Sequence, residues 1–239
     1  MAELTKEELN RYHRQLMLPG FGLEGQTKLK NAKVLVVGAG GLGCPVLQYL
    51  GAAGVGTIGI IDFDKIELHN LHRQVLYSTA DIGKPKAETA ATILKAQNPN
   101  VEFQVYNDIL NKKNSTQLIS QFDLVVDGSD NFPTRYLVND TCVELNKPLV
   151  YGSIFNFEAQ LAVFNYKGGK NLRDIYPEPP NPEDVPGCNE NGVLGVVPGI
   201  LGVYMANACI QVILGTYNNK SIMLFDLDQF GLVKLVMGK

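Results

Sequence analysis

Short apolar runs alternate along the first part of the chain with stretches in which apolar side chains recur every three or four positions. This pattern predicts buried strands at residues 32–37, 57–62, 123–127 and 148–152, and an alternating strand at 101–106. It predicts helices at residues 5–17, from about 44 onward, and at 84–97, 115–120 and 133–145. Strands that alternate with helices predict an α/β fold, Rossmann-like and doubly wound, with a mostly parallel sheet.

The pattern changes after residue 153. Residues 154–164 alternate as an antiparallel strand does, and residues 167–191 form a crossover loop that is either functional or mobile. A helix at 198–214 and strands at 221–227 and 231–236 complete a C-terminal antiparallel extension. We expect one domain over residues 1–239, made of a helical arm (1–30), a nucleotide-binding half (31–152) and a second half (153–239).

The composition argues against several classes of function. Of 239 residues, 45% are hydrophobic and 19% charged, and the net charge of −3 argues against nucleic acid as the main partner. No uninterrupted apolar run reaches about 18 residues, and the charged N-terminus lacks the apolar core of a signal peptide, so we expect a cytoplasmic protein without a membrane partner. The cysteines form no C-x-x-C pair, which argues against a disulfide framework and a thiolate zinc site.

A glycine-rich turn at residues 38–43 follows the first predicted strand and precedes a helix. Its glycines are Gly38, Gly40, Gly41 and Gly43. Such a turn lets the backbone and the helix N-terminus approach a phosphate, and Asp62, about 20 residues on, ends the next strand as a ribose-binding acid does. Taken alone, this motif favours NAD; the alternative is a turn that only permits close packing.

Charged side chains beyond the strand ends change this interpretation. Arg73 and Lys86 follow the second predicted strand, and Asp130 follows the strand at 123–127, so all three belong to the edge of the sheet where ligands bind. With the glycine turn, the two cations would hold a triphosphate, and a carboxylate beside phosphates typically holds Mg²⁺. Solvated surface charges and a helix cap remain the alternatives for these residues.

Five ordered motifs together resemble a family. They are Arg11-Tyr12-x-Arg14-Gln15, the GAGGLG turn, D-x-D at 62–64 with N-L-x-R-Q at 70–74, G-x-x-K at 83–86, and D-N at 130–131. They resemble the MoeB/ThiF/HesA adenylyltransferases, relatives of the ubiquitin-activating enzyme. The resemblance implies that ATP and Mg²⁺ adenylate the C-terminal Gly-Gly carboxylate of a small ubiquitin-like sulfur carrier, in molybdenum cofactor or thiamine biosynthesis. Pyrophosphate would be the other product, and we expect the sulfur to come from a separate donor protein.

The resemblance also implies roles for individual residues. It assigns the nucleotide to Gly38, Gly40, Gly41, Gly43, Asp62, Asp64, Asn70, Arg73, Gln74, Lys86, Asp130 and Asn131. Asp130 would hold Mg²⁺ and be the first catalytic residue, with Arg73 and Lys86 on the phosphates. Arg14 would act on the partner subunit's site in a homodimer. Cys188 would be either a covalent participant or an unreactive loop cysteine. Residues 153–239 would bind the carrier.

The chain departs from the family in one segment. Many members carry C-x-x-C where this chain has Asn171-Leu172-Arg173-Asp174, and a second pair that this sequence does not contain. We therefore predict no zinc and a less tethered 167–191 loop. Cys44, Cys142 and Cys209, in predicted helices, are expected to be small buried residues. Two alternatives stay open: an NAD-dependent oxidoreductase and an inactive family scaffold, although Arg14, Arg73, Lys86 and Asp130 are all present.

Overall fold

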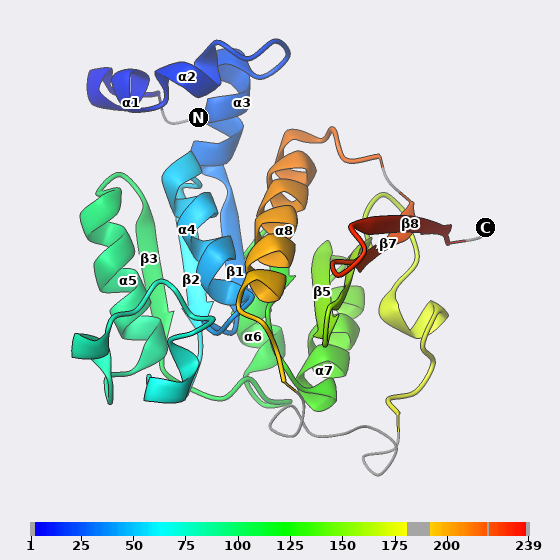
Figure 1. The fold of residues 1–239 in the computed structure, drawn as a ribbon. Helices are drawn as coiled ribbons and strands as arrows, with labels where there is room; N and C mark the ends of the chain where they lie inside the picture. Colours follow the sequence, from blue (N-terminus) through cyan, green and yellow to red (C-terminus); the bar gives the residue numbers. More distant parts are fainter. Residues whose placement is uncertain (1–2, 181–191, 219, 238–239) are drawn as a thin grey trace.

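An eight-stranded sheet forms the centre of the protein in the computed structural model, which describes residues 3–180, 192–218 and 220–237. The strands lie in the order β3-β2-β1-β4-β5-β6-β7-β8, and the first five are parallel (Figure 1). These parallel strands are β1 (Lys33–Val37), β2 (Thr57–Ile61), β3 (Glu102–Tyr106), β4 (Leu124–Asp127) and β5 (Leu149–Phe155). The strand order reverses between β1 and β4, which is the position where open α/β sheets bind ligands.

The predicted antiparallel extension is confirmed. Strand β6 (Glu158–Phe164) pairs antiparallel with β5, and β7 (Ser221–Asp226) and β8 (Gly231–Val236) continue the same sheet. The sheet therefore runs without interruption from the nucleotide-binding half that the sequence predicts into the second half. The whole arrangement confirms the predicted Rossmann-like, mostly parallel fold.

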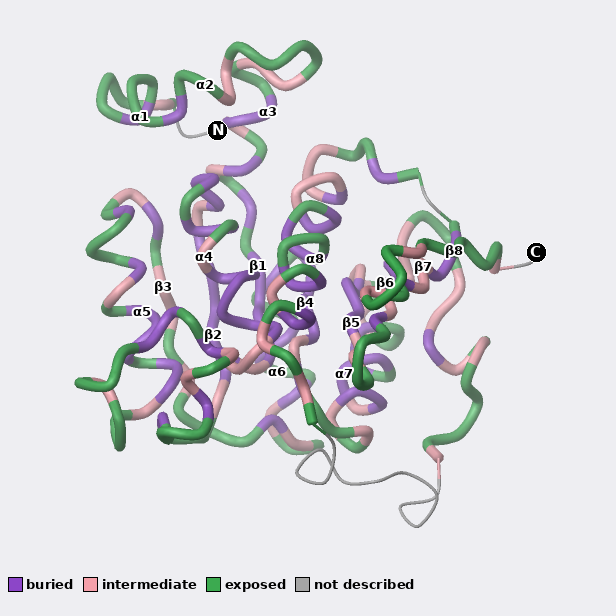
Figure 2. The backbone as a smooth tube through the Cα atoms, viewed as in Figure 1, coloured by how far each residue is buried: buried purple, intermediate pink, exposed green. Residues whose placement is uncertain are grey.

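Helices cover both faces of the sheet. Helices α4 (Gly43–Ala53), α5 (Lys86–Gln97) and α8 (Val196–Leu214) share one apolar core, and α6 (Ser115–Ile119) and α7 (Phe132–Glu144) share the other. Strand β1 shows how the sheet feeds both cores, because Val34 and Val36 face the first and Leu35 and Val37 the second. Figure 2 shows this buried interior, with exposed backbone concentrated at its periphery.

The N-terminal arm differs from its prediction. Instead of one helix over residues 5–17, the chain forms α1 (Lys6–Arg11) and α2 (His13–Leu16), which meet at Tyr12. Thr5 caps α1 in a reciprocal capping box with Glu8, as its position predicts. A further helix, α3 (Gly22–Asn31), was not predicted, because its glycines and polar residues give a weak helical pattern. Short 3₁₀ turns complete the fold: η1 (Leu68–Asn70), η2 (Thr79–Asp81) and η3 (Leu172–Asp174).

Helix α8 is an apolar core helix. Its 19 residues carry no charge, so by length and hydropathy alone this helix could cross a membrane, although the sequence shows no unbroken apolar run. Half of its apolar window is buried inside the protein, where the helix packs on α4, β5 and β6. A core helix between a sheet and a second helix meets the same criteria, and this packing accounts for the apolar sequence.

Candidate functional site

A large cavity opens at the carboxyl ends of the parallel strands. Its volume is about 1580 Å³, and its lining comes from both sides of the β1/β4 switch point. The lining includes Gly38, Gly40, Gly41, Asp62, Asp64, Asn70, Arg73, Gln74, Lys86, Asp130 and Asn131. The cavity thus brings together nearly all the residues that the resemblance assigned to the nucleotide. Pockets for one small ligand typically measure about 300–1,000 Å³, so this one has room for more than a nucleotide.

The four glycines of the turn have two different functions. A Cβ on Gly43 would lie 1.9 Å from the carbonyl oxygen of Gly38, and a Cβ on Gly38 would lie 2.9 Å from that of Gly128. These two positions therefore allow the loops after β1 and β4 to pack on the start of α4, and Gly43 does not line the cavity. Gly40 and Gly41 line the cavity, and the Cδ of Arg73 lies 3.6 Å from the position of a Cβ on Gly41.

Asp62 fastens the glycine turn to the end of β2. Its Oδ2 accepts the backbone N–H of Ala39 at 2.7 Å, and its Oδ1 accepts that of Asp64 at 2.8 Å. Burial raises the pKa of the Asp62 carboxyl, while the Ala39 N–H and the Lys86 ammonium favour its ionised form. Each carboxylate oxygen retains a second acceptor position, so ribose hydroxyls can still bind there.

The two predicted cations both follow β2 in the chain and both line the cavity. Lys86 begins α5, and its Nζ is 2.8 Å from Oδ2 of Asp64, although its side chain is only 7% exposed. Arg73 follows η1 and donates from Nη1 to the carbonyl oxygen of His69 at 3.1 Å, beside the His72 ring nitrogen at 2.9 Å. A buried ammonium held by one half-exposed carboxylate is a suitable partner for a polyanion.

Two amide side chains support the same wall. Asn70 is buried, and its Oδ1 accepts the backbone N–H of Glu67 at 3.2 Å, which shapes the turn that carries Arg73. Gln74 is also buried, and its Oε1 has no hydrogen-bond partner. Since buried polar atoms are nearly always paired, this oxygen marks a place where a ligand or water donor fits.

Asp130 and Asn131 lie between β4 and α7. Asn131 caps α7, with its Oδ1 accepting the Thr134 N–H at 3.0 Å, so the cap is this residue and not Asp130. Asp130 lines the cavity next to it. Among the described residues, no three His, Cys, Asp or Glu side chains gather as a metal cluster. Mg²⁺ that is bound together with substrate phosphates usually takes one or two protein carboxylates, so this donor set fits Mg²⁺.

A buried charge beneath the Asp130 loop was not found by sequence reasoning. Arg135 is 6% exposed, donates from Nη1 to Ser153 Oγ at 2.7 Å, and donates from Nη2 to the Ser129 carbonyl oxygen at 3.3 Å. Its guanidinium also lies over the rings of Phe132 and Tyr151. Asp127, fully buried at the end of β4, has a raised pKa because of burial, and the charge of Arg135 opposes that shift. A charged residue within a helical pattern carries no signal that it will be buried.

Of the other predicted residues, Arg14 does not line the cavity, and Cys188 belongs to the part of the chain that the structure does not describe. Arg14 lies on α2. Figure 1 shows α1 and α2 at the end of the sheet opposite the loop between β1 and α4. Cys188 lies outside the described residues, so its role stays a prediction.

The remaining cysteines are buried, as predicted. They are Cys44, Cys142 and Cys209. Burial raises the pKa of the Cys44 thiol to about 12 and also raises that of the other two, so all three are protonated at neutral pH. None of them is a candidate nucleophile.

Fold and site together define a nucleotide-binding α/β protein. The sequence matches the ThiF family over residues 12–234. A sulfur carrier protein adenylyltransferase of Thermus thermophilus is 54% identical over 216 residues, which cover 88% of this chain and 80% of that protein. The chain therefore belongs to the ThiF family, and it is an adenylyltransferase.

Longer relatives share the same region. The adenylyltransferase and sulfurtransferase MOCS3 of Danio rerio is 48% identical and covers 95% of this chain, which spans 50% of that protein. The probable adenylyltransferase/sulfurtransferase MoeZ of Mycobacterium tuberculosis is 49% identical over 90% of this chain and 56% of its own length. Among solved structures, E. coli MccB with ATP has a TM-score of 0.85 at 24% identity. The match covers 98% of this chain and 73% of that chain, and it shows a likeness of fold.

Proposed function

We propose that this chain uses ATP to adenylate the C-terminal carboxylate of a small ubiquitin-like sulfur-carrier protein that ends in Gly-Gly. One observation supports this proposal above all. The cavity gathers Gly41, Arg73, Lys86 and Asp130 from separate segments around one space that exceeds the needs of a nucleotide. A second substrate in the same space is what an adenylyl transfer requires.

The reaction suits a site without a general base. A carboxylate oxygen of the carrier tail forms a bond to the α-phosphorus of ATP, and the bond from that phosphorus to the oxygen bridging to the β-phosphate breaks. Pyrophosphate leaves with the electron pair, and the carrier keeps AMP as a mixed anhydride. A terminal carboxyl has a pKa of about 3.5, so it is already ionised at neutral pH. Catalysis then consists of alignment and of neutralising the phosphate charges.

Each charged side chain has a place in this scheme. The backbone of Gly40 and Gly41 and the side chains of Arg73 and Lys86 face the phosphates, and Asp62 faces the ribose. Lys86 can keep its contact with Asp64 while it binds a phosphate, because an ammonium has three donors. Asp130 is the residue that would hold Mg²⁺, which neutralises phosphate charge when bound.

The carrier belongs to the half of the chain after residue 153 in this proposal. The cavity extends from the nucleotide end to Ser153 and Ile154 on β5 and to Gln160 on β6, which lie two and three strands away from β1 in the sheet. The sulfur would come from a separate donor protein in the cytoplasm, and the pathway would be molybdenum cofactor or thiamine biosynthesis. Identification of the carrier by pull-down decides between the two pathways.

We also propose a homodimer in which Arg14 completes the partner's site. Arg14 is exposed on α2, away from its own cavity, and Ile200, Val203 and Tyr204 leave apolar surface exposed on α8. Mixing the inactive variants Arg14→Ala and Asp130→Ala tests this arrangement. In random mixed dimers one site of two regains both residues, so about a quarter of wild-type activity is expected. Activity equal to the sum of the two separate variants would contradict it.

Carrier-dependent exchange of pyrophosphate into ATP tests the activity itself. The wild type should catalyse exchange with a carrier that ends in Gly-Gly, and Asp130→Ala should lower the rate by about 10³-fold or more. Asp123→Ala is the matched control, because Asp123 lies at the opposite end of β4, where it accepts the Lys33 N–H. Absence of exchange with every such carrier, together with micromolar binding of NAD, would refute the proposal.

A further inference from the structure

The segment 171–180, here called the strap, forms one wall of the cavity. Ile175, Tyr176, Pro177 and Glu178 line it, and Figure 1 shows this segment on the α7 and β8 side of the sheet, away from α4. The sequence predicts a crossover loop over residues 167–191 that is less tethered than in zinc-bearing relatives, and its described part has several polar anchors of its own. Asn171 begins the strap by accepting the Arg173 N–H at 2.8 Å as the cap of η3. The strap therefore enters the cavity wall with a defined local structure.

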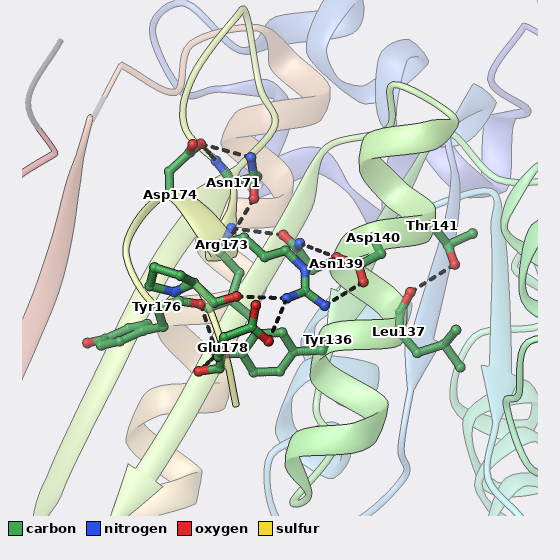
Figure 3. Close-up of polar contacts among 12 residues, drawn as sticks. Tyr136, Leu137, Asn139, Asp140, Thr141, Asn171, Arg173, Asp174, Tyr176 and Glu178 are labelled. Carbon is green, nitrogen blue, oxygen red and sulfur yellow. Dashed lines mark hydrogen bonds and ion pairs between the residues drawn. The ribbon is translucent and has the colours of Figure 1, made fainter. Parts of the chain in front are cut away.

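Arg173 ties the strap to helix α7. Its Nε donates to Oδ1 of Asp140 at 2.7 Å, and its Nη2 donates to Oδ2 of the same carboxylate at 2.9 Å. Its Nη1 donates to the carbonyl oxygen of Pro177 at 2.7 Å, so one guanidinium holds both α7 and the next turn of the strap (Figure 3). Such a two-point contact fixes orientation as well as distance.

Tyr136 and Asn139 add contacts one turn apart on the same helix. The Tyr136 hydroxyl, on a side chain that is largely buried, shares its proton between the carbonyl oxygens of Tyr176 at 2.9 Å and Glu178 at 2.8 Å (Figure 3). Oδ1 of Asn139 accepts the backbone N–H of Leu172 at 2.8 Å, and Leu172 is buried in the core under α7. The strap is thus fastened to α7 along its length.

The same helix also holds the loop that carries Asp130. Asn131 caps α7, and Arg135, next to Tyr136, donates to the carbonyl oxygen of Ser129. The beginning of α7 fixes the reacting loop, and the following turns fix the strap. A single helix therefore sets the separation between Asp130 and the opposite wall of the cavity.

We propose that Tyr136 and Arg173 are positioning residues that hold the strap as the wall against which the carrier's C-terminal tail is aligned toward Asp130. This inference rests on the proposed function. An extended peptide tail needs a wall at a fixed distance from the reacting phosphate, and a shift of about 1 Å in a reacting group can cost about a hundredfold in rate. ATP binds at the other end of the cavity and does not depend on the strap.

Steady-state exchange kinetics with separately varied carrier and ATP test this role. Tyr136→Phe and Arg173→Ala should each lower kcat/KM for the carrier by about tenfold, the scale of one or two lost hydrogen bonds. The KM for ATP and the ATP affinity from calorimetry should stay within about twofold of the wild type. Lys95→Met is the matched control, because Lys95 donates to the carbonyl oxygens of Pro99 and Val101 far from the cavity.

A double-variant comparison separates positioning from general stability. Asp140→Ala combined with Arg173→Ala should lose no more carrier kcat/KM than Arg173→Ala alone, because both remove the same contact. Unchanged carrier kinetics in the variants, or equal losses for ATP and carrier together with a lowered Tm, would overturn the proposal while wild-type exchange upholds the proposed function. Absence of exchange in the wild type would refute the proposed function, and the strap proposal with it.

Discussion

The two ends of the cavity are built in different ways. At the nucleotide end, the backbone itself sets the shape, because Gly38 and Gly43 let neighbouring loops approach more closely than any side chain permits. At the strap end, side chains set the shape, through the Arg173–Asp140 ion pair and the Tyr136 hydroxyl. Close packing tolerates almost no change, whereas polar contacts near the surface can be lost and made again.

Two ion pairs of similar length illustrate the same contrast. Lys86 and Asp64 are 2.8 Å apart with the lysine side chain 7% exposed, and Arg173 and Asp140 are 2.7 Å apart with both side chains more than a third exposed. Burying a cation costs free energy unless an anion compensates its charge, so the buried Lys86 ammonium suits a site that binds a polyanion. The exposed Arg173–Asp140 ion pair contributes little to stability, and its main effect is to hold the strap in one position.

The largest expected effect is on the backbone-built end. Gly43→Ala would place a methyl group 1.9 Å from the Gly38 carbonyl oxygen, so we expect a loss of about 3 kcal/mol or more in the free energy of unfolding. In Gly40→Ala, the new Cβ would lie 3.5 Å from Gln74 Nε2, an ordinary contact, and stability should stay within about 1 kcal/mol. Urea denaturation of both variants measures this difference. Equal losses would mean that close packing is not what distinguishes the two glycines.

The second largest expected effect concerns the charge of Lys86 at the nucleotide end of the cavity. Lys86→Met should lower kcat for exchange by about 10²–10³-fold, the scale for losing one preorganised charge. Stability should be unchanged or slightly higher, because Asp64 is half exposed and can hydrate. Lys84→Met is the control: Lys84 lies two residues before Lys86, its own side chain is 54% exposed, and breaking its pair with Asp81 should keep activity within about twofold. An activity loss that matches that of Lys84→Met would contradict the assigned role of Lys86.

The contrast between the two ends also explains what could be predicted from the sequence. The glycine turn, the strands around it and the residues at their carboxyl ends follow from local patterns and from sheet geometry. For this reason Arg73, Lys86 and Asp130 could be assigned to one edge of the sheet before the structure was known. Their detailed partners, such as Asp64 for Lys86, do not follow from any local pattern.

Long-range polar contacts account for most of what was missed. The strap is held by residues 33 to 42 positions away in the sequence, and no periodicity reports such a pairing. Arg135 is buried by aromatic rings and by the ends of β4 and β5, which only the folded chain brings together. Helix α3 was missed because its own helical pattern is weak, and because part of its stabilisation comes from a partner outside the helix, the Ala53 carbonyl oxygen that accepts from Gln26.

The smallest expected effect is a pH dependence of the strap. The hydrogen bonds from Arg173 hold the pKa of the Asp140 carboxyl below its ordinary value. An acid whose pKa is lowered on folding stabilises the fold fully above its unfolded pKa, near 3.9, and loses that contribution as the pH falls through its folded pKa. The strap should therefore hold equally well between about pH 6 and 8 and loosen only in acid.

Hydrogen exchange of the strap amides, corrected for the intrinsic rate, measures this loosening. Because the pair is exposed, we expect it to change protection by about fivefold or less, corresponding to below about 1 kcal/mol. Asp140→Asn should show the reduced protection already at neutral pH and lose little more in acid. A wild-type strap that loosens between pH 6 and 8, or an Asp140→Asn strap as protected as the wild type, would show that other contacts hold this wall. The buried Tyr136 hydroxyl would then be the main anchor, and the difference between the two ends of the cavity would be smaller than the ion pairs indicate.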